Sequence, residues 1–231
     1  MGVQYRGCSH LYYAIETDNN GTITYGTPKV LAPVKSVSFD VTDDNESIYA
    51  DNIVQDRVYG AKQVTRTFET IRISPEVAAE LLGDTIITIG EGTSAKKGIA
   101  TNPDGSSKPY IAIGVALHDG DVDSPCEIYW AYHCKVNSIS KSSNTIDDGT
   151  GSEGQSIEIV NVAPKKAWTT TGKRNLDFDL IIPDGLTASQ IATLVSTFFT
   201  QVVTPDNAST ILNPVTPAET PAETTPSTDP E

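Results

Sequence analysis

Alternation of apolar and polar residues, the pattern typical of a half-buried β-strand, recurs along most of the chain. It is clearest at 110–117 and 127–136, where every second residue is apolar. The acidic segment between these two runs predicts a hairpin turn. In the second run the alternation predicts one shared face for Ile128, Trp130, Tyr132, Cys134 and Val136.

Shorter runs of the same kind predict the remaining strands. Asn20-Gly21 predicts a tight hairpin between the first two, because this dipeptide favours the turn with positive φ angles. We place these further strands at 11–15, 22–25, 36–41, 64–73, 85–89, 156–163 and 176–182.

Two segments have the period of an amphipathic helix. A short helix is expected at 75–82, with Ser74 as its N-cap, Pro75 in its first turn and Gly83 as its C-terminal stop. A second helix begins after Thr187, which forms a capping-box pair with Gln190. Its apolar residues recur at i, i+3, i+4 and i+7, so it must pack on the sheet.

Three segments are expected to lie outside this regular structure. Residues 42–60 are expected to form a long acidic loop whose apolar residues dock on the chain's own core or on a neighbouring subunit. Residues 90–107 are expected to form a loop, because they are rich in Gly, Ser and Lys. Residues 142–155 are expected to be mobile, because they have almost no apolar anchor. The resulting division is a β domain at 1–186, an amphipathic helix at 187–203 and a disordered Pro/Thr-rich acidic tail at 204–231.

The charge of the chain narrows the classes of function. The formal net charge is −14, which disfavours a general nucleic-acid binder. From Asp177 onward there are eight acidic residues and no Lys or Arg, so the C-terminal quarter carries more than half of that charge. No apolar run approaches the length of a membrane span, and the N-terminus has no apolar core of the signal-peptide kind. We therefore expect no membrane partner.

Residues able to carry chemistry are few and scattered. Cys8, Cys126 and Cys134 have no CxxC spacing and are expected to be reduced thiols. The three histidines, His10, His118 and His133, show no spacing typical of catalysis or metal binding. The Asp119–Asp123 run lacks the Gly and Glu that a calcium loop needs. We expect no enzyme activity, no metal and no cofactor.

Four stretches, in order, resemble a known family. They are similar to segments of the major tail proteins, the tail tube subunits, of phages with long non-contractile tails, in the phi13-like group. The resemblance covers about Leu11 to Ala163 and leaves out the C-terminal helix and tail. Its stretches are LYYAIETDNNGTITYGTPKVLA near the start, IYADN at 48–52, ISPEVAAELLG at 73–83 and PYIAIGVALHDGDVDSPCEIYWAYHCKV at 109–136.

The resemblance implies a fold and an assembly. The fold is mainly β, with two packed antiparallel sheets in a sandwich or barrel, a short flanking helix and long loops; this chain adds a C-terminal helix. Such subunits form stacked, typically hexameric rings around a lumen that holds the tape-measure protein before DNA passes. Tail terminator and distal tail proteins are further implied partners, and the implied location is the virion, after assembly in the host cytoplasm. The loop at 42–60 is implied to reach the adjacent ring, which makes the candidate inter-subunit contacts Tyr49, Ala50, Asp51 and Asn52.

An acidic lumen that repels DNA is a further hypothesis, because a conduit must let DNA slide without binding it. Two rival classes of function stay open. The first is a non-catalytic carbohydrate-binding β-sandwich with an exposed aromatic platform. The platform residues are Tyr12, Tyr13, Tyr129 and Trp168. The second is a hydrolase that uses Asp177 and Asp179, which share one face of their predicted strand.

Overall fold

The computed structural model describes residues 5–20, 22–50, 53–120, 124–141 and 154–212, and within them the chain is mainly β. The strands are β1 Gly7–Asn19, β2 Thr22–Tyr25, β3 Lys29–Val30, β4 Val34–Ala50, β5 Ile53–Thr70, β6 Thr85–Ile89, β7 Lys96–Ala100, β8 Ile111–His118, β9 Pro125–Lys141, β10 Gln155–Asn161 and β11 Asp177–Ile181. The helices are α1 Pro75–Leu82, α2 Ala188–Thr200 and α3 Ala208–Leu212, with short 3-10 turns at Gly92–Ser94 and Gly105–Ser107.

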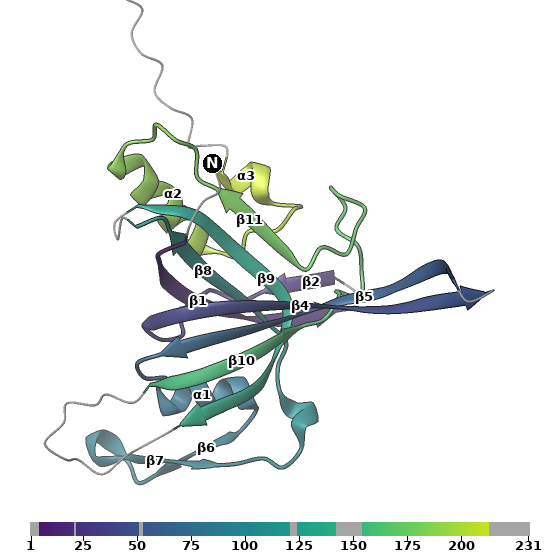
Figure 1. Cartoon of the computed structure of the whole chain (residues 1–231). Coiled ribbons are helices and arrows are strands. Elements are labelled where there is room, and N and C mark those ends of the chain that lie inside the picture. Colours follow the sequence, from purple (N-terminus) through teal and green to yellow (C-terminus); the bar gives the residue numbers. More distant parts are fainter. Residues whose placement is uncertain (1–4, 21, 51–52, 121–123, 142–153, 213–231) are drawn as a thin grey trace, which may run out of the picture.

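Nine of these strands form one large antiparallel sheet, and β6 and β7 form a small second sheet. The large sheet runs in the order β2-β1-β8-β9-β10-β5-β4 (Figure 1). β3 pairs with β1, and β11 pairs with the first half of β9 while β10 pairs with its second half. The mainly antiparallel β fold with a short flanking helix and a C-terminal helix is therefore confirmed.

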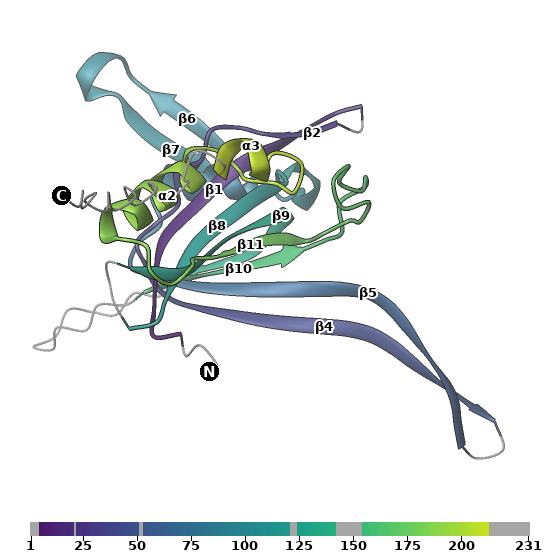
Figure 2. The ribbon, with the colours of Figure 1, turned by 90° about the horizontal axis from the view of Figure 1, so that it is seen from above.

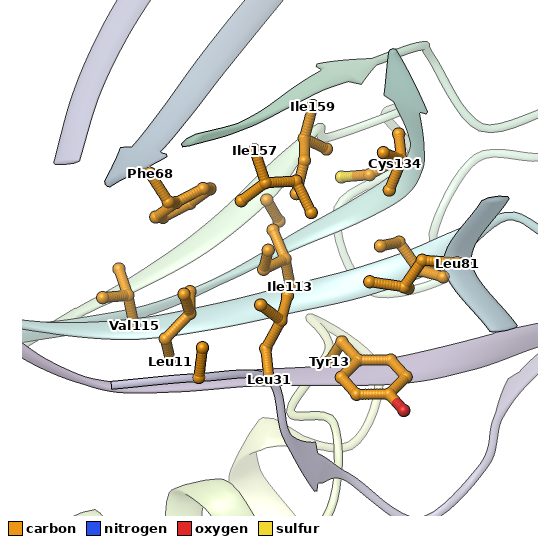
Figure 3. Packing of buried hydrophobic residues seen from close by; sticks show 14 of the residues in the cluster. Leu11, Tyr13, Leu31, Phe68, Leu81, Ile113, Val115, Cys134, Ile157 and Ile159 are labelled. Atoms are coloured by element: carbon orange, nitrogen blue, oxygen red, sulfur yellow. The ribbon is translucent and has the colours of Figure 1, made fainter. Parts of the chain in front are cut away.

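The large sheet curls, so that β4 at one end of the order comes close to β1 near the other end. The curled sheet encloses a core of side chains from β1, β5, β8, β9 and β10, which Figure 3 shows converging on one interior. Phe68, Ile113 and Ile157 are fully buried there. α1 contributes Leu81 to the same core and lies at one end of the strands (Figure 1). Many of the apolar residues that alternate along the predicted strands have their side chains in this barrel-like interior.

The outer face of β1, β8 and β9 is covered by α2 and α3. Phe198 and Phe199 of α2 pack on Trp130, whose indole Nε1 donates a hydrogen bond to the carbonyl oxygen of Phe198 at 3.1 Å. The hydroxyl of Tyr132 donates to the carbonyl oxygen of Val203 at 2.5 Å. Strand β8 is buried on both faces for this reason, with the curled core on one side and the helices on the other.

Both helices begin as their sequences predict. The hydroxyl of Ser74 accepts a hydrogen bond from the amide of Val77, and Gly83 ends α1 with φ at 72°. A capping box joins Thr187 and Gln190 at the start of α2. The described helices are all too short to cross a bilayer.

The prediction of one shared face for the five apolar residues of β9 is wrong. Trp130 and Tyr132 pack under α2, whereas Cys134 and Val136 point into the curled core. Between them His133 has φ at 49°, and the pairing of β8 with β9 shifts between Ile111 and Ile113. This bulge inserts one residue into the alternation and exchanges the two faces.

Three predicted irregular segments are also corrected. Within 42–60, residues 42–50 and 53–60 are not a loop, because they belong to the paired outer parts of β4 and β5. The 90–107 segment contains β7, which pairs with β6. The tail predicted from residue 204 instead begins with an ordered segment that includes α3 and the buried Ile211. The positions from 213 onward, and most of the predicted 142–155 loop, lie outside the described residues.

Candidate assembly interface

A long two-stranded ribbon projects from the body of the molecule (Figure 2). We define the arm as residues 43–50 of β4 together with residues 53–62 of β5. β5 pairs with β10 only from Val64 to Thr70, so within the described residues the two strands of the arm pair with each other alone. A strand of 17 residues such as β4 spans roughly 55 Å, and about half of that length lies in the arm.

Apolar side chains on the arm are exposed. Ile48 is 47% exposed and Ile53 is 59% exposed. Val41, just inside the base of the arm, is 59% exposed as well. Docking of this segment on the chain's own core, one of the two outcomes expected for it, is therefore not seen at these positions. An isolated two-stranded ribbon is at best marginally stable in water, so contact with another molecule would stabilise it.

Two of the four predicted inter-subunit contact residues, Tyr49 and Ala50, lie at the far end of the arm. The backbone of Tyr49 pairs with Val54, and the backbone of Ala50 pairs with Ile53. Asp51 and Asn52, which connect the two strands, lie outside the described residues. The arm and its base are acidic, since residues 40–62 contain six carboxylates and only Arg57 and Lys62 as bases.

A buried arginine fixes the base of the arm. Arg66 on β5 is 3% exposed, and its Nη2 donates to Oδ2 of Asp177 on β11 at 2.6 Å. Its Nη1 donates to Oδ1 of Asn161 on β10. The guanidinium carbon lies 5.6 Å from the ring centroids of both Phe39 and Tyr129. Arg66 therefore ties β5 to four other strands where the arm leaves the sheet. Sequence alternation did not single it out, because a charged residue occupies a core position.

The two aspartates of the hydrolase alternative lie beside this arginine. Asp177 and Asp179 line a cavity of about 180 Å³ together with Glu127 and Tyr129. Burial and the neighbouring carboxylate of Asp177 raise the pKa of Asp179 to about 6. The structure thus brings the pair together as predicted, but Asp177 is held by Arg66. The carboxylate of Asp177 therefore belongs to the ion pair at the base of the arm.

A cluster that the sequence did not predict joins two of the three histidines. The hydroxyl oxygen of Ser9 lies 2.7 Å from Nδ1 of His10 and 2.7 Å from Nε2 of His118. His10 has φ at 56° at a bulge of β1, and its ring stacks on Phe199 of α2 at 5.6 Å. Burial and the nearby His118 lower the pKa of His10. Only the pairing of β1 with β8 brings these residues together, so their separation along the chain concealed the cluster.

His133 and the cysteines lie elsewhere. Nδ1 of His133 is 2.7 Å from Oε1 of Glu16, and the ring stacks on Tyr110 at 3.9 Å. Cys8, Cys126 and Cys134 are free thiols, as the spacing of the three indicates. In the described part of the chain, no three His, Cys, Asp or Glu side chains are arranged to hold a metal ion.

The aromatic platform of the carbohydrate-binding alternative is contradicted. Tyr13, Tyr129 and Trp168 are buried, and only Tyr12 retains part of its surface. Tyr13 points into the curled core and donates from its hydroxyl to Oε2 of Glu80 on α1 at 2.7 Å. Trp168 donates from Nε1 to the carbonyl oxygen of Asn175 at 3.1 Å. These rings stabilise the fold and are not available to stack on a sugar.

Comparison with known proteins gives distant structural similarities, including the two below. No protein-family model and no curated protein matches the sequence. One solved structure, the tube-terminating cap of the anti-feeding prophage, is 9% identical with a TM-score of 0.37, over 79% of this chain and 95% of that chain. A second, the sheath–tube complex of the extracellular contractile injection system PVC in its extended state, is 11% identical with a TM-score of 0.35, over 75% and 90% of the two chains. At these TM-scores we build no argument on either similarity.

Proposed function

We propose that this chain is a structural subunit of a phage tail tube, which assembles into stacked, hexameric rings around a conduit for DNA. The observation that carries the proposal is the arm. In the described residues its two strands pair only with each other, and they expose Ile48 and Ile53. A surface of this kind is completed by another copy of the chain. The four sequence stretches that resemble tail tube subunits support the same class.

The remaining features of the chain are consistent with an assembly role. A formal net charge of −14 keeps a subunit with exposed apolar ribbons soluble before assembly. The same charge would let DNA slide past without binding. We infer no catalytic step, no metal and no cofactor for this chain. Its inferred partners are the tape-measure, tail terminator and distal tail proteins, and its inferred location is the virion.

The arm can be removed without entering the core, which provides the test. Thr42 and Gln63 are paired, so residues 43–62 can be replaced by Asn-Gly to close a two-residue hairpin between them. We expect wild-type protein to form large assemblies in light scattering as its concentration rises. We expect the armless variant to keep its far-ultraviolet circular dichroism and stay monomeric. Equal assembly of the two proteins would overturn the proposal that the arm joins the subunits.

A further inference from the structure

The β6–β7 hairpin is a second projecting element with exposed apolar residues. In the described part of the chain neither strand pairs with the large sheet. All five residues of β6 are exposed, and Ile87 and Ile89 are 48% and 61% exposed. A free two-stranded hairpin that exposes isoleucines on both faces is marginal in water and is a candidate interaction surface.

Contacts at its base and with α1 hold this hairpin, so it presents its surface in a defined direction. Oδ1 of Asp84 accepts a hydrogen bond from the amide of Asn102 at 2.9 Å. Nζ of Lys97 lies 3.5 Å from Oε1 of Glu76 on α1. A Cβ on Gly83 would come within 2.6 Å of the carbonyl oxygen of Ser107, which shows how closely the chain packs at the base. A surface held this way loses little conformational freedom when it binds.

The register of the hairpin distinguishes its two faces. Residues directly opposite in an antiparallel pair share a face, and Lys97 is opposite Thr88. Since Lys97 reaches Glu76, its face is turned toward α1. The other face, which we call the outer face, consists of Thr85, Ile87, Ile89, Lys96, Gly98 and Ala100.

Gly98 is not explained by the fold of its own chain. A Cβ placed there would meet no atom closer than 4.0 Å, and no positive φ angle requires glycine at this position. Glycine weakens a strand, so its presence opposite Ile87 favours a close approach by another backbone. Gly98 and the flanking Ile87 and Ile89 thus form a flat apolar strip with Lys96 at its edge.

The charge and position of the arm make it the matching surface. The segment 85–100 contains Lys96 and Lys97 against a single acid, Glu91, whereas the arm and its base are acidic. The hairpin and the arm project from opposite sides of the body (Figure 2). Complementary surfaces on opposite sides of one subunit generate head-to-tail contacts, which is the arrangement that a ring or a stack requires.

We propose that the outer face of the β6–β7 hairpin binds the β4–β5 arm of a second copy of this chain. The apolar strip packs on the exposed Ile48 and Ile53 of that arm, and Lys96 faces its carboxylates. This inference rests on the proposed tube assembly and names the pair of surfaces that forms one of its contacts.

A glycine substitution tests the contact without disturbing the core. Gly98→Val adds a side chain with strong strand propensity to the outer face. We expect the variant to fold with an unfolding midpoint equal to or above that of wild type. We expect it to need at least a tenfold higher protein concentration than wild type before it assembles. Thr88→Val, on the face turned toward α1, is the matched control and is expected to assemble normally. Normal assembly of Gly98→Val would overturn the contact.

A mixing experiment reports the contact directly. Protein carrying Ile87→Cys is mixed with protein carrying Ile53→Cys under mild oxidation, so that a disulfide between the two types can form only between copies. We expect mixed dimers well above the level given by wild type, by each variant alone, or by Ile86→Cys in place of Ile87→Cys. If wild type assembles but the mixed disulfide does not exceed these controls, the contact is wrong while the tube proposal stands. If wild type never assembles, the tube proposal fails and the contact fails with it.

Discussion

Arg66 and Asp177 form an ion pair between β5 and β11 with a nitrogen-to-oxygen distance of 2.6 Å, at the point where the arm leaves the curled sheet. The side chain of Arg66 is almost completely buried, while that of Asp177 is 36% exposed. Removing one partner of such a pair leaves the other charge poorly solvated, and this costs more than the pair itself contributes.

Replacing Arg66 by Met is therefore expected to lower the free energy of unfolding by about 3 kcal/mol. The loss has three sources, since the variant leaves Asp177 and Asn161 without their donor and removes the guanidinium from Phe39 and Tyr129. Urea denaturation followed by tryptophan fluorescence measures it. Lys165→Met, which breaks the exposed pair with Asp18, is the control and should change stability by less than about 1 kcal/mol. Equal stability of the two variants would contradict the structural role of Arg66.

Asp179 should make stability depend on pH in the direction opposite to most carboxylates. Its pKa is about 6 in the folded protein and about 3.9 in an unfolded chain. Between these values the folded protein holds a proton that the unfolded chain has lost, so raising the pH through this window destabilises the fold. Asp179→Asn should therefore stabilise the protein at pH 7.5 and have little effect at pH 4. The gain should stay below about 1 kcal/mol, because Asp179 is only partly buried and water screens its charge. Chemical denaturation at the two pH values checks this, and a gain that is larger at pH 4 would have the wrong sign.

Gly114 sets the distance between β8 and α2. A Cβ at this position would lie 2.9 Å from ring carbons of both Phe199 and Trp130. Gly114→Ala should therefore lower the free energy of unfolding by roughly 1–3 kcal/mol, since two packed aromatic rings must move. Gly105→Ala is the matched control, because a Cβ there would meet nothing within 4 Å. Thermal unfolding compares the two, and a Gly114→Ala midpoint as high as that of Gly105→Ala would show that α2 packs less closely.

The C-terminal helices should be required for a stable subunit. A chain ending at Leu186 loses α2 and α3, and it exposes Trp130 and Tyr132 with the rest of the outer face of β8 and β9. We expect this truncation to aggregate or to bind a hydrophobic dye strongly. A chain ending at Leu212 keeps every described residue of the C-terminal segment and should unfold like the full chain. Wild-type behaviour of the shorter truncation would make the helices dispensable.

Local chemistry was the most predictable part of this fold. Ser74, Pro75 and Gly83 specify the ends of α1, and Thr187 with Gln190 specifies the start of α2, because each cap depends on residues within one turn. The strand centres were also predictable from alternation. The faces of β9 were not, since the bulge at His133 depends on the register with β8, which lies in a distant part of the chain.

The assembly surfaces were the least predictable part. The arm was expected to be a loop because its many Asp and Glu residues have low strand propensity, yet its two strands pair with each other. The bounds predicted for strand 64–73 were also wrong, because the strand ends at Thr70 and leaves Ile71 and Ile73 outside it. The inward positions are Val64, Arg66, Phe68 and Thr70, and the buried charge of Arg66 hid that register. β7 and the Ser9 cluster were not predicted for a similar reason, because each depends on pairing between two strands.

Electron microscopy of the purified wild-type protein in negative stain, with light scattering on the same sample, tests the central claim most directly. We predict rings or hollow tubes of uniform width, with a scattering mass that rises steeply with protein concentration. A subunit that stays monomeric at high concentration, with no ring or tube in the images, would contradict the proposal that this chain forms a tail tube by itself.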